Sequence, residues 1–254
     1  MDNLENYKLV FEEDFELPEL NTEKWEDKQP WGRIHPNNPH QYYASDCVQI
    51  TDQVLRLKQK YSHTEIEHWN GEVYTPEYAV GLVASKQSWR YGLFEFEAKL
   101  PTGRGLWPAI WLTAKEGWPP EIDIVEGYTT DKTHYNILPW FFKRRVETNV
   151  HYRETVDHLP INIKGKPHWM WKNPAKHFIK YSCHWTENFI NLYYDKYLVR
   201  SITDPYIMAG FNKEMYIVLN NAIHRDYMYS INPYQESELE IKSVKVYQNE
   251  EKSN

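Results

Sequence analysis

Three acidic residues interleave with branched apolar residues in the stretch Trp118-Pro119-Pro120-Glu121-Ile122-Asp123-Ile124-Val125-Glu126-Gly127. Successive side chains of a β-strand point to opposite faces, so Glu121 and Asp123 share one face. Glu126 lies five positions after Glu121 and would point to the other face of a regular strand. A single β-bulge between Asp123 and Glu126 restores the phase and brings all three carboxyl groups to one side.

Three acids on one face repel one another, so the cluster indicates a metal site or acid/base chemistry more than a structural role. The spacing fits glycoside hydrolysis, in which two carboxyl groups flank the scissile bond, about 5–5.5 Å apart in retaining enzymes. A third acid between them would share a proton with its neighbours and separate their pKa values. An exposed acidic strand and a cation site with oxygen ligands are the alternatives.

A tryptophan-rich segment precedes the acidic stretch. Between Gly105 and Leu112, Trp107 and Trp111 alternate onto one face of a predicted strand, and Ile110 lies on the other. Indole rings on the face that carries the acids could stack on the apolar faces of sugar rings. The alternative is that both tryptophans belong to the core.

Composition limits the class of protein. The chain has 254 residues, of which 41% are hydrophobic and 26% are charged, as in a globular domain. Its net charge of -7 argues against a nucleic-acid binder, and no apolar run reaches membrane-spanning length. Cys47 and Cys183 could form one bridge or remain thiols. The acidic N-terminus lacks a secretory signal pattern, so the compartment stays open: secreted or periplasmic if a leader has been removed.

Short β-rich runs bounded by turn residues recur along the chain, and helical periodicity is nearly absent. The pattern predicts an all-β protein, a β-sandwich or jelly roll, with one domain over residues 1–254 and a core from about 7 to 248. The expected strands are 54–57, 92–100, 106–113, 121–126, 189–194, 215–219 and 239–247.

One region is basic within an otherwise acidic chain. The segment from Phe141 to Lys180 contains nine lysines and arginines and three acidic residues, with prolines and glycines interspersed. We expect much of this region to be a long loop. It is either a solvated loop or a basic rim for an anionic ligand.

The chain resembles glycoside hydrolase family 16, the laminarinase-like jelly-roll enzymes. The resemblance extends over nearly the whole chain, and its most specific part is the motif Glu121-x-Asp123-x-x-Glu126. The other matching segments, in order, are Asn38 to Tyr43, Gly81 to Lys86, Tyr91 to Glu95, Gly105 to Leu112, Trp185-Thr186, the segment around Asp195, Leu219-Asn220 and Val244 to Tyr247.

The resemblance implies a β-sandwich with an open substrate cleft on the concave sheet. It implies that Glu121 is the nucleophile, that Glu126 is the general acid/base, and that Asp123 holds the nucleophile's geometry and proton. The extra residue in the motif is similar to the bulged subgroup of laminarinases, agarases and carrageenases. The expected substrate-binding residues are Trp107, Trp111, Trp118, His151, Asn38 and Asn220; for His151 a structural role is the alternative.

Several positions depart from the family pattern. His40 stands where glucanases commonly have Glu, and Glu97 where Arg is frequent; both positions are expected near the sugar sites. Pro120 replaces the usual Gly before the first catalytic Glu. Lys242 stands where many relatives carry an acidic calcium ligand, which argues against a structural calcium. We expect no metal in the active site and no required cofactor.

These observations together predict a retaining endo-hydrolase of a polysaccharide, with laminarin-type β-1,3-glucan as the substrate. The alternatives are an endo-hydrolase of a sulfated or anhydro-galactan (carrageenan, porphyran or agar) and an inactive carbohydrate-binding protein of the same fold. Interception of the covalent intermediate by a sugar, which is transglycosylation, also stays open. The expected partner is a polysaccharide, with no nucleic acid and no membrane insertion, and the expected state is a monomer.

Overall fold

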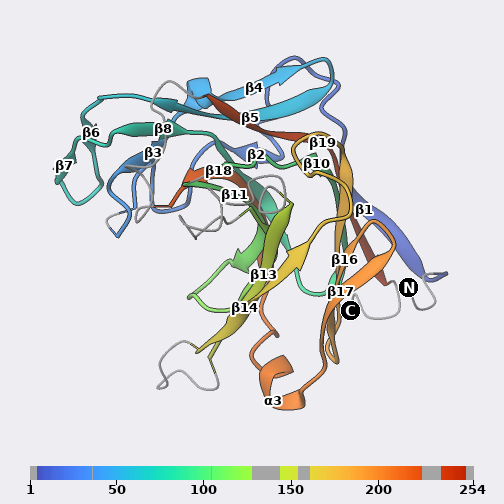
Figure 1. Ribbon diagram of the computed structural model, residues 1–254. Helices are drawn as coiled ribbons and strands as arrows, with labels where there is room; N and C mark the ends of the chain where they lie inside the picture. Colours follow the sequence, from blue (N-terminus) through green and yellow to red (C-terminus); the bar gives the residue numbers. More distant parts are fainter. Residues whose placement is uncertain are drawn as a thin grey trace.

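The computed structural model describes residues 5–35, 37–103, 105–127, 144–153, 161–224 and 236–249, without the side chains of 162–164. Two large antiparallel-dominated sheets make up most of this part of the chain (Figure 1). The residue alternation that predicted strands also explains the layering, because each strand buries one face between the sheets.

The first sheet has ten strands. Its main path runs β17 (Tyr197–Ile202), β16 (Ile190–Tyr194), β15 (Ile179–Trp185), β10 (Gly92–Lys99), β19 (Ser237–Asn249), β5 (Val54–Tyr61), β8 (Tyr78–Val80) and β3 (Gln41–Tyr43). Off this path, β1 (Tyr7–Glu13) pairs with β19 and β4 (Val48–Thr51) pairs with β5.

The second sheet has seven strands and contains the acidic stretch. Its order is β14 (Ile161–Trp169), β13 (Arg145–Tyr152), β12 (Glu121–Glu126), β11 (Leu106–Ala114), β18 (Met215–Ile223), β9 (Leu82–Trp89) and β2 (Trp25–Glu26). The acidic strand β12 therefore lies in the interior of this sheet, with β11 on one side and β13 on the other.

The remaining elements are small. A hairpin of β6 (Ile66–Glu67) and β7 (Val73–Tyr74) projects beyond β3 and β8 at one end of the molecule (Figure 1). A 3-10 turn spans Ser45–Cys47, and the α-helix α3 spans Pro205–Met208. Among the described residues, no helix has the length and apolarity needed to cross a membrane.

The main hydrophobic core lies between the two sheets. Phe94 and Phe96 of β10 are completely buried in it, together with Ile110 of β11 and Ile122 of β12. On β10 the intervening Glu95 faces outward and forms an ion pair with Lys180. The alternation of these strands thus places apolar side chains in the core and leaves the opposite faces for other contacts.

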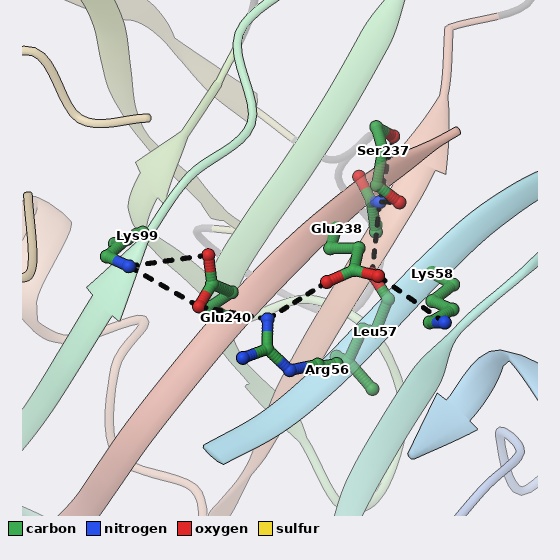
Figure 2. A network of polar contacts seen from close by, with 8 residues as sticks. Arg56, Leu57, Lys58, Lys99, Ser237, Glu238 and Glu240 are labelled. Carbon is green, nitrogen blue, oxygen red and sulfur yellow. Dashed lines mark hydrogen bonds and ion pairs between the residues drawn. The ribbon is translucent and has the colours of Figure 1, made fainter. Parts of the chain in front are cut away.

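On the outer face of the ten-stranded sheet, opposite charges face each other across β5, β19 and β10 (Figure 2). Arg56 Nη1 lies 3.0 Å from Glu238 Oε2 and 3.1 Å from Glu240 Oε2. Lys58 and Lys99 flank this group, each with its Nζ 3.4 Å from a carboxylate oxygen of Glu238 or Glu240. Such half-exposed pairs contribute little stability each, but they favour this register.

Polar contacts also connect the two sheets through the core. Asn221 of β18 is completely buried, and its Nδ2 donates to the carbonyl oxygens of Leu57 and Ser237, 3.1 Å away in each case. Figure 2 shows Leu57 and Ser237 on the strands of the opposite sheet. Cys47 and Cys183 are both buried free thiols, so they do not form a bridge.

The seven predicted strands are confirmed, and the all-β sandwich with them. The prediction of a long loop in 141–180 is wrong for residues 145–152 and 161–169, which form β13 and β14, and for the start of β15, whereas residues 170–178 carry no strand. In β13, Val146 and Val150 alternate with outward polar residues and are completely buried. Pro167 is compatible with β14 because β14 is an edge strand. Lys143, Glu154, Asp157 and Pro160 of this region lie outside the described residues.

Candidate active site

The predicted bulge is present in β12. Against β11, Asp123 is opposite Trp111, whereas Val125 is opposite Ile110, so that Ile124 is the extra residue. Both Ile124 and Val125 are completely buried in the core. Because two successive side chains point inward, Glu126 returns to the face that carries Glu121 and Asp123. We call this side of the seven-stranded sheet the acid face.

Glu121 accepts a hydrogen bond from an indole on the preceding loop. Trp118 Nε1 donates to its Oε2 over 2.9 Å. His151, which is opposite Glu121 on β13, places Nε2 3.4 Å from Glu121 Oε1 and 3.4 Å from Asp123 Oδ2. His151 therefore contacts both acids directly, and its ring centroid lies 5.7 Å from that of Trp118.

Glu126 accepts a hydrogen bond from a different indole. Trp107 Nε1 donates to its Oε1 over 2.7 Å, and the Trp107 ring centroid lies 5.0 Å from that of His224. Across the sheet, Glu126 is opposite Glu147 of β13. Each glutamate thus accepts a hydrogen bond from a different indole, and Glu126 has Glu147 opposite it where Glu121 has His151.

Asp123 is the most buried of the three acids, with 5% of its surface exposed. Its carboxyl group is in hydrogen-bond contact with that of Glu121, and the guanidinium of Arg200 favours its ionised form. A hydrogen bond between two carboxyl groups needs one proton for the pair. Asp123 and Glu121 are therefore placed to share a proton.

Burial is the largest influence on all three acids, and it raises the pKa of each above its usual range. The negative charge of Asp123 raises the pKa of Glu121 and of Glu126 further. The hydrogen bond from Trp118 to Glu121, and that from Trp107 to Glu126, act in the opposite direction. The three groups cannot all ionise together near neutral pH, so the site holds at least one exchangeable proton.

The same residues could hold a metal ion. Glu121, Asp123 and His151 each offer one ligand atom, and these atoms lie within 4.8 Å of one another. The indole N–H groups of Trp107 and Trp118 point at the carboxylate oxygens instead, which suits charged or proton-sharing carboxylates. That the site works without a metal stays a prediction.

Trp111 and Asn220 lie on the acid face and bond to each other. Trp111 Nε1 donates to Asn220 Oδ1 over 2.6 Å. The Trp111 ring packs against a second apolar cluster that includes Tyr216 and Val218, on the side of the sheet away from the main core. A saccharide-binding role for the pair stays a prediction.

Asn38 lies in the loop between β2 and β3, where its backbone N–H donates to the carbonyl of His35 over 2.8 Å. Its side-chain oxygen is buried and accepts no hydrogen bond from the described residues. The same loop reaches the seven-stranded sheet through His40, whose Nε2 is 3.0 Å from the carbonyl oxygen of Ile223. His40 thus lies at the end of β18, next to the acid face.

The expectation that Glu97 lies near the sugar sites is wrong. Glu97 is on β10 of the other sheet, and its Oε1 is 3.5 Å from Lys242 Nζ. The resemblance placed Glu97 by sequence alone, whereas strand alternation puts it on the outer face.

Sequence reasoning missed two buried polar residues of the opposite sheet, Tyr194 and Arg200. Arg200 has the same phase as Ile202 in β17, and both are buried. That phase is readable from the sequence as an inward position. A charged residue at such a position is a signal that it has a polar partner in the core.

Comparison with known proteins agrees with this geometry. The model of glycosyl hydrolases family 16 matches residues 39–223, so the chain belongs to this family. The crystal structure of SCLam, a non-specific endo-β-1,3(4)-glucanase of the same family, has a TM-score of 0.76 and 26% identity, covering 96% of this chain and 92% of that one. This likeness confirms the jelly-roll form of the sandwich.

Two curated relatives are also similar. The endo-1,3-1,4-β-glycanase EglC of Rhizobium meliloti (strain 1021) is 28% identical over 84% of this chain and 46% of its own length. A β-glucanase of Rhodothermus marinus is 33% identical over 52% of this chain and 49% of its own length. The chain thus spans about half the length of these curated relatives.

Proposed function

We propose that the chain is a retaining endo-hydrolase of β-1,3-glucan of the laminarin type. The observation that carries the proposal is the bulge in β12, which puts Glu121, Asp123 and Glu126 on one face. Membership of family 16 and the β-glucanase names of its relatives support the substrate class. The proposal therefore includes both the hydrolysis reaction and the catalytic roles of Glu121, Asp123 and Glu126.

In this mechanism Glu121 is the nucleophile and Glu126 the acid/base. Glu126 donates its proton to the leaving glycosidic oxygen while a carboxylate oxygen of Glu121 attacks the anomeric carbon, and the C–O bond to the leaving sugar breaks. Glu126 then takes a proton from water, whose oxygen displaces Glu121 from the anomeric carbon. The configuration at that carbon is retained after two displacements.

The surroundings of the two glutamates fit these roles. Burial raises the pKa of both glutamates, and an indole N–H and the charge of His151 act against it at each, so the difference between them is Glu147, which acts on Glu126 alone. Glu126 lies opposite Glu147, whose negative charge favours a protonated Glu126. Asp123, in hydrogen-bond contact with Glu121, holds its orientation and takes up a proton when Glu121 must be charged.

The first experiment compares carboxyl variants on laminarin. Glu121→Gln and Glu126→Gln should each reduce kcat by about a thousandfold or more while the protein stays folded and still binds the glucan. Glu95→Gln is the matched control, because Glu95 lies on the outer face of the other sheet and should leave kcat unchanged. Near-normal turnover in either active-site variant contradicts the mechanism. Retained binding by a wild type that releases no reducing sugar identifies a carbohydrate-binding protein instead.

A sulfated galactan is the second candidate substrate, favoured by one observation. Arg153 Nη2 lies 3.5 Å from the carbonyl oxygen of Trp118, so a guanidinium lies beside the acid face and could pair with a sulfate. Parallel digestion of laminarin, lichenan, agar, porphyran and carrageenan distinguishes the two candidates by the oligosaccharides released.

A further inference from the structure

At the bulge, the backbone carbonyl of Ile124 has no partner residue on the neighbouring strand β11. Ile124 has no opposite residue on β11, because the register moves from Asp123 to Val125 across it. Its carbonyl oxygen accepts a hydrogen bond from the hydroxyl of Tyr194, 3.1 Å away. Tyr194 belongs to β16 of the other sheet and is buried in the core. The bulge is therefore held by a side chain that crosses the sandwich.

A second side chain crosses the sandwich beside the first. On β13, Glu147 is opposite Glu126 and Asn149 is opposite Asp123, so Thr148 is the residue that faces the bulge. Arg200 Nη1 donates to the Thr148 carbonyl oxygen over 2.7 Å and contacts its Oγ1 at 3.3 Å. Only 7% of Arg200 is exposed. The bulged strand β12 and its neighbour β13 thus each accept a hydrogen bond from a side chain of the ten-stranded sheet.

His168 of β14 contacts both Thr148 and Tyr194. His168 Nε2 lies 3.2 Å from Thr148 Oγ1, and its ring centroid lies 5.7 Å from that of Tyr194. Burial, with the positive charges of Lys166 and Arg200, lowers the pKa of His168 to about 4, so this imidazole is neutral at pH 7. The positive charge beneath the acids therefore resides on the guanidinium of Arg200.

We propose that Tyr194 and Arg200 are positioning residues for the hydrolysis: from the opposite sheet they fix the backbone of β12 and β13 and so set the spacing of the three acids. This inference rests on the proposed function. The titratable groups that face the pair are Asp123 and Glu126 of β12, Glu147 of β13, Lys166 and His168 of β14, and Tyr181 of β15.

The physical reason is the small tolerance of the reaction for displaced groups. A buried carbonyl that loses its donor raises the free energy of the folded state, and the bulge can lower it only by a shift of its backbone, because Ile124 has no partner on β11. A shift of about 1 Å between catalytic groups lowers turnover by about a hundredfold. Arg200 also places a positive charge on the core side of Asp123, which favours the carboxylate.

The first test is Tyr194→Phe, with Tyr181→Phe as its matched control. Tyr181 is equally buried and in ring contact with Tyr194 at 5.1 Å, but its hydroxyl has no hydrogen-bond partner among the described residues. We expect kcat of Tyr194→Phe to fall by about tenfold or more with KM within about twofold, and Tyr181→Phe to match wild type. An unchanged kcat in Tyr194→Phe, or an equal loss in both variants, overturns the proposal.

The second test does not use activity. NMR of the backbone carbonyl ¹³C nuclei of Ile124 and Thr148 reports on the two crossing hydrogen bonds in wild type, Tyr194→Phe and Arg200→Met. Tyr194→Phe should move the Ile124 signal and Arg200→Met the Thr148 signal, and both variants should also move the backbone signals of Asp123 and Glu126, whereas Tyr181→Phe should leave all of them in place. Unmoved signals of Asp123 and Glu126 in both variants overturn the proposal; if Arg200→Met does not fold, Arg200→Lys replaces it under the same criterion. A wild type that cleaves no glycan refutes the proposed function but leaves this measurement as a test.

Discussion

Glu121 and Glu126 have different neighbours on the same face of one strand. Glu121 contacts His151 and the Trp118 indole, and Glu126 contacts the Trp107 indole with Glu147 opposite. The sequence predicts that Glu121 and Glu126 lie on one face, because side-chain alternation and the bulge place them there. It does not indicate that Trp107 and Trp118 would donate to the acids, since a hydrogen bond depends on ring orientation and not on spacing.

At the residue scale, Glu147→Gln should move the alkaline limb of activity. Glu147 raises the pKa of Glu126, so its neutralisation lowers that pKa, and Glu126 loses its proton at lower pH. The alkaline limb of kcat/KM should shift to lower pH by about half a unit or more. The check is a pH profile on laminarin, with Glu95→Gln as control. A shift to higher pH contradicts the assignment.

A second residue-scale prediction concerns stability. The folded-state pKa of Glu126 is raised to about 8, above its value in the unfolded chain. The neutral form is therefore favoured by folding, and wild type loses stability as pH rises from about 4.5 towards 8. Glu126→Gln cannot ionise, so its stability relative to wild type should increase over this range, by more than about 1 kcal/mol at pH 8. Urea unfolding at pH 4.5 and pH 8 measures it; a constant difference contradicts the raised pKa.

At the element scale, the alternation of side chains along β12 determines which face each acid lies on. Its bulge was predictable because only an extra residue brings Glu126 back to the face of Glu121. The strand β13 was missed although Val146 and Val150 alternate, because prolines, glycines and lysines elsewhere in 141–180 suggested a loop. The crossing contacts of Tyr194 and Arg200 could not be predicted, since they depend on how two sheets stack.

The side-chain alternation of β12 predicts the outcome of deletions in this strand. Deleting Val125 gives Glu-Ile-Asp-Ile-Glu, whose strict alternation keeps the three acids on one face. We expect this variant to fold and to retain about 1% of activity or more. Deleting both Ile124 and Val125 sends the last Glu towards the core, where an unpaired carboxylate costs several kcal/mol, so this variant should lose stability and all activity. Circular dichroism and laminarin assays check both; equal activity in the two deletions contradicts the phase argument.

At the scale of the whole molecule, the all-β sandwich followed from recurrent short strands, whereas the pairing order of the two sheets did not. We propose that this sandwich holds no structural calcium. Lys242 Nζ is 3.5 Å from Glu97 Oε1 on the outer face of the ten-stranded sheet, where a cation already neutralises the acid. EDTA, and calcium at millimolar concentration, should each change Tm by less than about 2 °C, because ligand binding shifts Tm only when the folded state has a site. A Tm that rises with calcium contradicts the proposal.

The most direct test of the account is to trap the covalent intermediate. A 2-deoxy-2-fluoro glucoside or laminaribioside with a good leaving group slows both displacements, and the second more, so that the glycosyl-enzyme accumulates. Peptide mass spectrometry should then locate the fluorinated sugar on Glu121, with inactivation that laminarin oligosaccharides compete against. A label on Glu126 or Asp123, or turnover by inversion with no label at all, would contradict the retaining mechanism assigned to this face.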